Sequence, residues 1–200
     1  MACNELTRGI NPNCDALRKA GGLNKRVYIG LLSDLTSVTF AETGQITGFT
    51  FAANKGFVKF IGKKEKHNTA MTLEVGESFT LRNHAVNLVA YYSTAEELTA
   101  LDSLIDVEGL FMVAETNNGE LEVWGVNNAP NWANFGLTAA SLQGGSGTAI
   151  LDPNIYTLGF TGNHENLQKY FVSNPVTPST LAEDIAILEA QVIWPAPPAP

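Results

Sequence analysis

Three histidines are the residues best suited to chemistry in this sequence, because an imidazole binds metal ions and exchanges protons near neutral pH. His67, His84 and His164 are isolated from one another and form no H-x-H or H-E-x-x-H pair. A zinc site needs three or four nitrogen or sulfur ligands held together. We therefore expect each histidine to be a surface or strand residue, and we expect no bound metal.

Hydroxyl groups and glycine-rich turns offer no stronger candidate. The glycine cluster around Ser146 lacks the lysine of a phosphate-binding loop and the spacing of a Gly-x-Ser-x-Gly nucleophile turn. Asp152 and Asn154 provide too few oxygen atoms for calcium, and an Asx turn explains them better. These patterns predict a flexible loop and a turn.

Acidic pairs could transfer protons if their surroundings separated their pKa values. Glu96 and Glu97 fall in a helical pattern, and Glu120 and Glu122 fall in an alternating hairpin pattern, which favours solvent-exposed carboxylates. The sequence therefore predicts a protein that is not an enzyme and holds no cofactor.

The two cysteines, Cys3 and Cys14, lie in a glycine- and asparagine-rich stretch without a nearby histidine or a CxxC pair. A zinc site would lack half of its ligands. Two ordinary thiols are expected, with a local disulfide as the alternative.

Composition and charge limit the remaining protein classes. The 200 residues are 44% hydrophobic and 16% charged, which suits a folded domain. A net charge of −8 argues against a nonspecific nucleic-acid binder, which needs a basic face. The net charge is +4 over residues 1–82 and −12 over residues 83–200. This asymmetry fits either contact between unlike surfaces of identical copies or chance, because folding mixes the two halves.

Two further absences shape the expected location. No apolar run is long enough to span a membrane, and the start of the chain shows no secretion signal. We therefore expect no membrane partner and synthesis in the cytoplasm.

Short β-rich runs make up most of the chain. They fall at residues 26–32, 38–40, 46–51, 57–61, 79–92, 110–115, 121–126 and 155–161. The turns at Gly44 and at Asn117-Asn-Gly119 predict two hairpins. Residues 57–75 follow a strand, charged segment, strand pattern, which predicts a projecting hairpin with a charged tip. Residues 127–147 have too little apolar content to form core by themselves.

Two helical patterns interrupt the strands. Ser93 and Glu96 match a capping box, and four apolar residues follow at helical spacing: Leu98, Leu101, Leu104 and Ile105. A shorter helical pattern runs from Ser179 to Leu188, and the chain ends in a proline-rich tail at residues 195–200.

These elements predict a mainly β fold: a β-sandwich or barrel of antiparallel strands with one flanking α-helix, a projecting hairpin and extended terminal arms. We divide the chain into an N-terminal arm at residues 1–24, a β-sandwich domain at 25–172 and a C-terminal extension at 173–200, with the short helix and the proline-rich tail. Arms and open sheet edges need a partner surface, which favours a self-assembling structural protein.

Several stretches, in order, resemble a family of small virion proteins of Bacteroidetes phages and prophages, the tail tube proteins. The opening Met-Ala-Cys-Asn, the second cysteine and the Gly-Gly pair lead into Lys25-Arg-Val-Tyr-Ile29. Ile46-Thr-Gly-Phe-Thr50 and residues 109–119 continue the likeness. The most specific stretch is Ser146-Gly-Thr-Ala-x-x-Asp152-x-Asn154-x-Tyr-Thr-Leu-x-Phe-Thr-Gly162. The resemblance covers about residues 1–165, and the chain departs from the family pattern after Gly162.

This resemblance implies that copies of the chain form rings, usually of six subunits, which stack into a tube within the phage tail. It implies other virion proteins as partners, and DNA that passes through an often acidic bore without specific binding. It also implies that a projecting hairpin docks on the adjacent subunit or ring. We therefore expect Lys63, Lys64 and Lys66 either to contact an acidic neighbouring copy or to form an exposed, solubilising tip.

Two other functions stay open from the sequence. A different virion component, namely a head decoration, head–tail connector or baseplate protein, shares every sequence feature. A carbohydrate-binding β-sandwich module would use exposed aromatic residues such as Trp124, Trp132 and Trp194, although Trp124 lies in a strand expected to be buried.

Overall fold

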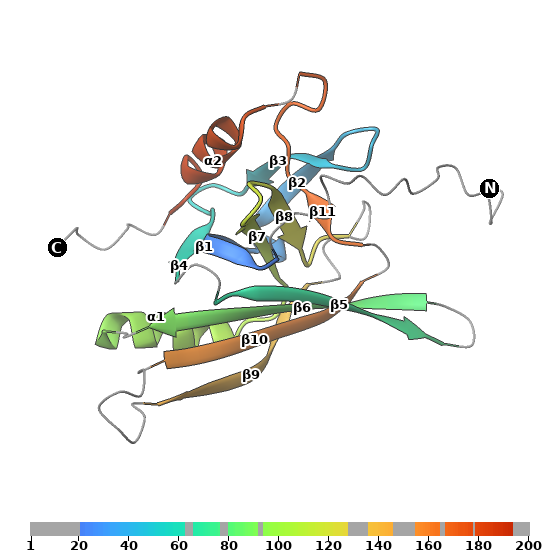
Figure 1. Cartoon of the computed structure of the whole chain (residues 1–200). Helices are drawn as coiled ribbons and strands as arrows, with labels where there is room; N and C mark the ends of the chain where they lie inside the picture. The colour runs from blue at the N-terminus through green and yellow to red at the C-terminus, as the bar shows by residue number, and fades with distance from the viewer. Residues whose placement is uncertain are drawn as a thin grey trace.

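The structure is a computed structural model, and it describes residues 21–62, 66–76, 80–91, 94–127, 136–145, 155–164, 167–177 and 179–193. These residues form a mainly β fold in which two antiparallel sheets pack face to face (Figure 1). The predicted β-sandwich is confirmed. Within the described strands both sheets are open, so the barrel alternative is not formed.

The first sheet has five strands in the order β11 (Lys169–Tyr170), β8 (Leu121–Trp124), β7 (Leu110–Thr116), β1 (Leu23–Leu31) and β4 (Val58–Ile61). All neighbouring strands run antiparallel. Every residue of the central strand β7 is buried. β7 and β8 form the hairpin predicted from Asn117-Asn-Gly119, whose glycine adopts a φ of 80°.

The second sheet has four strands in the order β5 (Asn68–Val75), β6 (Thr80–Tyr91), β10 (Ile155–His164) and β9 (Thr138–Gly145). β6 and β10 pair over ten residues each and form its centre. Strand β9 lies within residues 127–147, which were expected to have too little apolar content to form core by themselves, and all but one of its residues are exposed. Its many alanine, serine and glycine residues give little of the apolar alternation that indicates a strand. Its pairing with β10 fixes it in the sheet.

The hairpin predicted over residues 57–75 is wrong. β4 pairs with β1 in the five-stranded sheet, whereas β5 pairs with β6 in the four-stranded sheet. The intervening charged segment is therefore a crossover between two layers and not the tip of a hairpin. The hairpin that projects from the molecule is β5–β6, which extends beyond the five-stranded sheet (Figure 1).

A third layer covers the other face of the five-stranded sheet. It consists of a hairpin, β2 (Leu35–Phe40) and β3 (Ile46–Phe51), and of helix α2 (Leu181–Glu189). A 3₁₀ turn at Leu32–Asp34 leads into β2. A core of buried residues between this layer and the five-stranded sheet includes a cluster of aromatic rings, among them Phe49, Phe57, Phe111 and Phe171.

Helix α2 is an integral part of the fold, although its segment was expected to be a C-terminal extension. Thr180 and Glu183 form its capping box. After the helix, Phe57 N donates to Gln191 O at 2.9 Å and Ile193 N donates to Phe57 O at 3.0 Å. Residues 179–193 therefore pack on the strands of their own chain.

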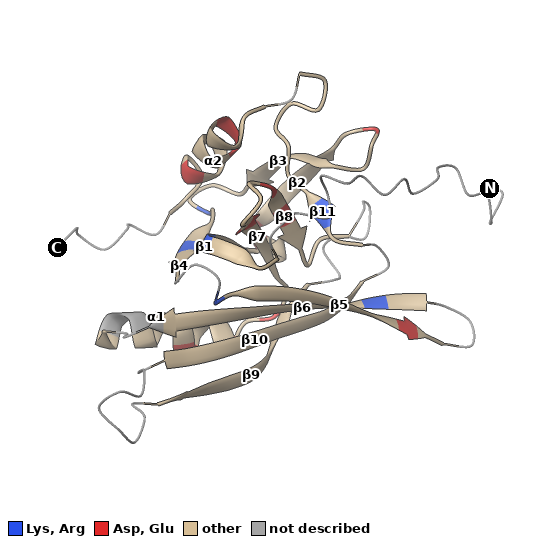
Figure 2. Ribbon diagram, viewed as in Figure 1, with Lys and Arg blue, Asp and Glu red and all other residues tan. Residues whose placement is uncertain are grey.

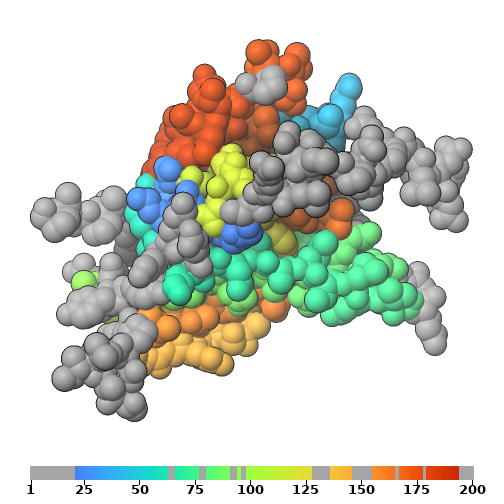
Figure 3. Space-filling model, in the orientation of Figure 1, coloured from blue at the N-terminus to red at the C-terminus, as the bar shows by residue number. Residues whose placement is uncertain are grey.

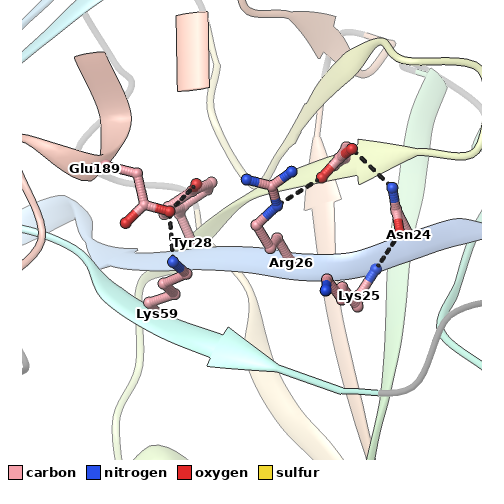
Figure 4. Close-up of polar contacts among 7 residues, drawn as sticks. Asn24, Lys25, Arg26, Tyr28, Lys59 and Glu189 are labelled. Carbon is pink, nitrogen blue, oxygen red and sulfur yellow. Dashed lines mark hydrogen bonds and ion pairs between the residues drawn. The ribbon is translucent and has the colours of Figure 1, made fainter. Parts of the chain in front are cut away.

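Charged groups also attach α2 to the five-stranded sheet (Figure 4). One carboxylate oxygen of Glu189 accepts from Tyr28 Oη at 2.8 Å and from Lys59 Nζ at 2.5 Å. Burial, and then the bond to Glu189, raise the pKa of Tyr28 well above its usual range, so the hydroxyl keeps its proton and donates it. Along the same strand, Arg26 Nε donates to Glu115 Oε2 at 2.9 Å.

The core between the two sheets also holds helix α1 (Ala95–Ile105), which confirms the helix predicted after Ser93; Ser93 itself lies outside the described residues. Leu101 is buried in this core, and Leu98, Leu104 and Ile105 pack against it. The apolar stripe seen in the sequence therefore faces the sheet, as expected.

Replacing Leu101 by alanine should lower the free energy of unfolding by about 2 kcal/mol, the low end for a buried leucine, because the site borders an open groove. Thr99→Ala, at an exposed position of the same helix, is the matched control and should change it by less than about 0.5 kcal/mol. Urea unfolding of the monomer measures both. Equal midpoints for Leu101→Ala and the wild type would place this face of α1 outside the core.

Candidate assembly surface

Strand β5 forms one exposed edge of the four-stranded sheet. Seven of its eight residues are exposed, and Leu73 and Val75 expose 62% and 75% of their surface. Figure 3 shows the β5–β6 hairpin standing out from the side of the molecule. An exposed edge offers unpaired backbone groups to another strand.

The apolar side chains of β5 lie on the face that points towards the five-stranded sheet. Thr69 is opposite Val86, and Met71 is opposite His84, and both partners are buried in the interlayer core. Thr69 Oγ1 still reaches Glu122 Oε2 of β8 at 3.4 Å. Farther along the strand the same face becomes exposed, and we call its three residues, Met71, Leu73 and Val75, the hairpin stripe.

Strand β9 forms the opposite edge. All of its residues except Ala139 are exposed, and it contains no charged residue and no proline. Soluble proteins usually protect such an edge with lysine, proline or a covering segment. A bulge at Ala140 interrupts the pairing with β10, but residues 141–145 pair regularly. This edge is therefore suited to pairing with another strand.

A shallow groove runs along β9 where α1 crosses the end of the sheet. Its volume is about 350 Å³, and its apolar lining consists of Leu98, Leu101, Ile105, Leu142 and Tyr156. Leu142 also exposes 47% of its surface. Apolar surface thus lies beside both edges of the sheet.

The face of the four-stranded sheet that points away from the other layers is rich in uncharged amides. Asn87 Nδ2 donates to Asn68 Oδ1 at 2.7 Å, and Asn83 Nδ2 donates to Asn163 Oδ1 at 3.1 Å. Figure 2 colours β9 and β10 entirely as uncharged residues. In its described residues this face carries a single acidic residue, Glu74, and no lysine or arginine.

The lysines predicted to contact a neighbouring copy belong to the segment of sequence between β4 and β5. Lys66 is exposed immediately before β5, while Lys63 and Lys64 lie outside the described residues. Their contact with another copy therefore stays a prediction. The same holds for the other expectations at positions outside the described residues: Cys3, Cys14, Trp132, Ser146, Asp152, Asn154 and Trp194.

The expectation that each histidine is a surface or strand residue holds for His84 and His164 and is wrong for His67. His84 lies in β6 and His164 in β10, as strand residues, but both are buried, and so is His67 in the crossover. The burial of His84 and His164 cannot be seen from sequence periodicity, because a polar residue in an alternating strand normally indicates the side that faces solvent. Trp124, expected in the core, is buried next to His84.

Glu122 also differs from expectation, because its carboxylate is not on a solvated face. It accepts from Trp124 Nε1 at 3.1 Å, and burial raises its pKa. The described residues nevertheless contain no group of three or more His, Cys, Asp or Glu side chains placed to hold a metal ion. The features that remain as a candidate site are the two sheet edges and the apolar surface beside them.

Comparison with known family models, with curated proteins and with solved structures finds no match for this chain. A search of the described helices finds none with the length and apolar character needed to cross a membrane.

Proposed function

We propose that this protein is a structural virion component, most simply a phage tail tube protein, whose copies assemble into rings that stack into a conduit for DNA. The observation that supports this proposal is the four-stranded sheet with exposed strands at both edges, β5 and β9. The resemblance of residues 1–165 to tail tube proteins agrees with it.

The direction of the strands allows the edges of two copies to pair with each other. All four strands are antiparallel to their neighbours, so β5 and β9, at positions one and four, run in opposite directions. If β5 of one copy lies beside β9 of the next, the antiparallel order continues across the contact. Such a head-to-tail contact is heterologous and closes into a ring when its rotation fits.

The amide-rich face of the sheet suits the lining of a conduit. DNA is held nonspecifically by lysine and arginine, which displace counterions from its phosphates. The described residues of this face carry neither, so a bore lined by it would let DNA slide. A carbohydrate-binding module would instead need exposed aromatic side chains, and Trp124 is buried.

Negative-stain electron microscopy of the purified chain tests the function directly. We expect open-ended tubes of uniform width. Closed single rings without stacking would favour a head decoration, connector or baseplate role, and monomers at high concentration would contradict self-assembly.

Two edge variants test the head-to-tail contact. Ala70→Lys/Thr72→Lys places two charges on β5, and Ser141→Lys/Gln143→Lys places two on β9, all at exposed positions. Each variant alone should be monomeric by light scattering, and a 1:1 mixture should form a heterodimer, because each retains the edge that the other has lost. Val176→Lys, at a loop position that is 89% exposed, is the matched control and should assemble normally.

The mixture separates this contact from the symmetric alternatives. If β5 paired with β5, the β9 variant would still form homodimers by itself. If β9 paired with β9, the β5 variant would do so. Normal assembly of both variants would show that neither edge takes part.

A further inference from the structure

All three histidines of the chain lie between or beside the two sheets and are almost completely shielded from water. The rings of His84 and His164 stack with their centroids 4.3 Å apart and their planes 22° apart. The indole of Trp124 from β8 meets the His84 ring edge-on at 5.1 Å. Two imidazoles thus join the central strands of one sheet to a strand of the other.

A glycine provides the room for this stack. Gly162 of β10 is opposite His84 in the register, and a Cβ at Gly162 would lie 3.0 Å from His164 Nε2 and would collide with Gly136 O. Any larger residue would therefore displace the Gly136 backbone and press on the His164 ring. The lack of a side chain at Gly162 therefore leaves space for the His164 ring.

His67 occupies the crossover from β4 to β5. Its Nδ1 accepts from the backbone N–H of Val89 at 3.0 Å, just beyond the last residue of β6 that pairs with β5. The Nδ1 atom must be unprotonated to accept this bond, so the neutral ring carries its proton on Nε2. Nε2 is buried, and no described residue accepts from it. Protonation at Nδ1 would break the bond to Val89.

We propose that these buried histidines form an acid-sensitive joint, so that mildly acidic solution weakens the packing of the four-stranded sheet on the five-stranded sheet. A proton on either stacked ring would place a positive charge in the core, and protons on both would place two such charges face to face. This inference concerns the single chain and goes beyond the proposed function.

The ionisable groups that face the joint come from both sheets. On its own sheet, Arg82 of β6 is opposite His164, and the neutral Met71 of β5 is opposite His84. β9 contributes no ionisable side chain. From the five-stranded sheet, Glu122 of β8 faces the interlayer core beside Trp124, and Tyr170 of β11 is opposite Glu122.

The pKa shifts of the histidines determine whether stability rises or falls as the pH drops. Burial, and then the charge of His84, lower the pKa of His164 to about 3, and burial lowers the pKa of His67. The unfolded chain therefore takes up these protons at higher pH than the folded chain, so stability falls as the pH drops below about 6.5. The raised pKa of Glu122 has the opposite sign, since the folded chain there binds a proton more readily.

Urea unfolding of the full chain, kept monomeric by dilution, tests the joint. For each histidine that stays neutral in the folded state, the unfolding equilibrium constant should rise about 30-fold between pH 7.5 and 5.0. The double variant His67→Asn/His164→Phe removes both histidines whose pKa is lowered by burial, and asparagine can still accept from Val89. Its rise should be smaller than that of the wild type by at least about 30-fold, the contribution of His164 alone. Leu158→Met, a nontitrating change in the same core, is the control and should keep the wild-type pH dependence.

A second measurement does not depend on the folding of a variant. Imidazole NMR signals of the wild-type chain should show His164 neutral in the folded state at pH 5.0, and His67 with a pKa below that of a free imidazole. Titration of these signals near pH 6.5 without loss of structure would overturn the proposal. So would an equal pH dependence of the wild type and the double variant.

Discussion

Replacing Phe111 by alanine is expected to lower the free energy of unfolding by about 3–5 kcal/mol, the range for a fully buried phenylalanine. Phe111 is the second residue of β7 and has no exposed surface. Its ring lies 5.2 Å from that of Phe49 and 5.5 Å from that of Phe57, centroid to centroid. Thermal and urea unfolding measure the loss, and a change below about 1 kcal/mol would contradict this packing.

A paired change tests the same packing more closely. Gly30 of β1 is opposite Phe111, and a Cβ on Gly30 would lie 2.5 Å from Phe111 Cε1, so the phenyl ring fills the space that a side chain would occupy. Gly30→Ala should therefore cost about 1–3 kcal/mol by itself. Combined with Phe111→Leu, it should cost less than the sum of the two single changes. Additive costs would show that the two residues do not compete for this space.

Replacing Leu188 by alanine is expected to lower the free energy of unfolding by about 2–5 kcal/mol. Leu188 has no exposed surface and packs in the core between α2 and the five-stranded sheet. The adjacent Ile187 is 39% exposed on the same helix and provides the matched control. Ile187→Ala should cost clearly less, and urea unfolding of the two variants gives the comparison.

Equal and small losses for the two variants would mean that α2 is a detachable extension. Deletion of residues 179–200 provides a second test of the same point. Because α2 covers one face of the five-stranded sheet, the shortened chain should lose cooperative unfolding. A shortened chain that unfolds like the full chain would contradict the observed packing.

The elements that sequence reasoning predicted correctly have local causes. The Asn117-Asn-Gly119 turn fixes the β7–β8 hairpin, because it needs residues that tolerate positive φ. The leucine spacing after Ser93 fixes the buried face of α1. These features depend on neighbours within a few residues, which the sequence displays directly.

The errors concern contacts between distant segments. β4 and β5 look like the arms of a hairpin, but β4 pairs with β1, more than 25 residues earlier in the chain. β9 has little apolar content, and its partner β10 places it in the sheet. The burial of His84 depends on Trp124, which approaches from the other layer. No local pattern contains this information.

The candidate site was predictable only in outline. Arms, open edges and the lack of catalytic groups indicated an assembly surface, but the sequence placed it on Lys63, Lys64 and Lys66. In the structure the candidate surface instead consists of the exposed edge strands β5 and β9. Their exposure depends on the order of strands in the sheet. Strand order is set by long-range pairing, so a single sequence does not reveal which edges stay open.

The path of the chain between the layers has a consequence during synthesis on the ribosome. The steps from β4 to β5, from β6 to β7, from β8 to β9 and from β10 to β11 all change sheet. The five-stranded sheet therefore cannot be completed until β11 has been synthesised, although β1 emerges from the ribosome early. At about 5–20 residues per second, the delay between these two strands is roughly 7–30 s. Throughout that time the nascent chain carries unpaired strands, and its escape from aggregation depends on the speed of translation and on chaperones rather than on the stability of the finished fold.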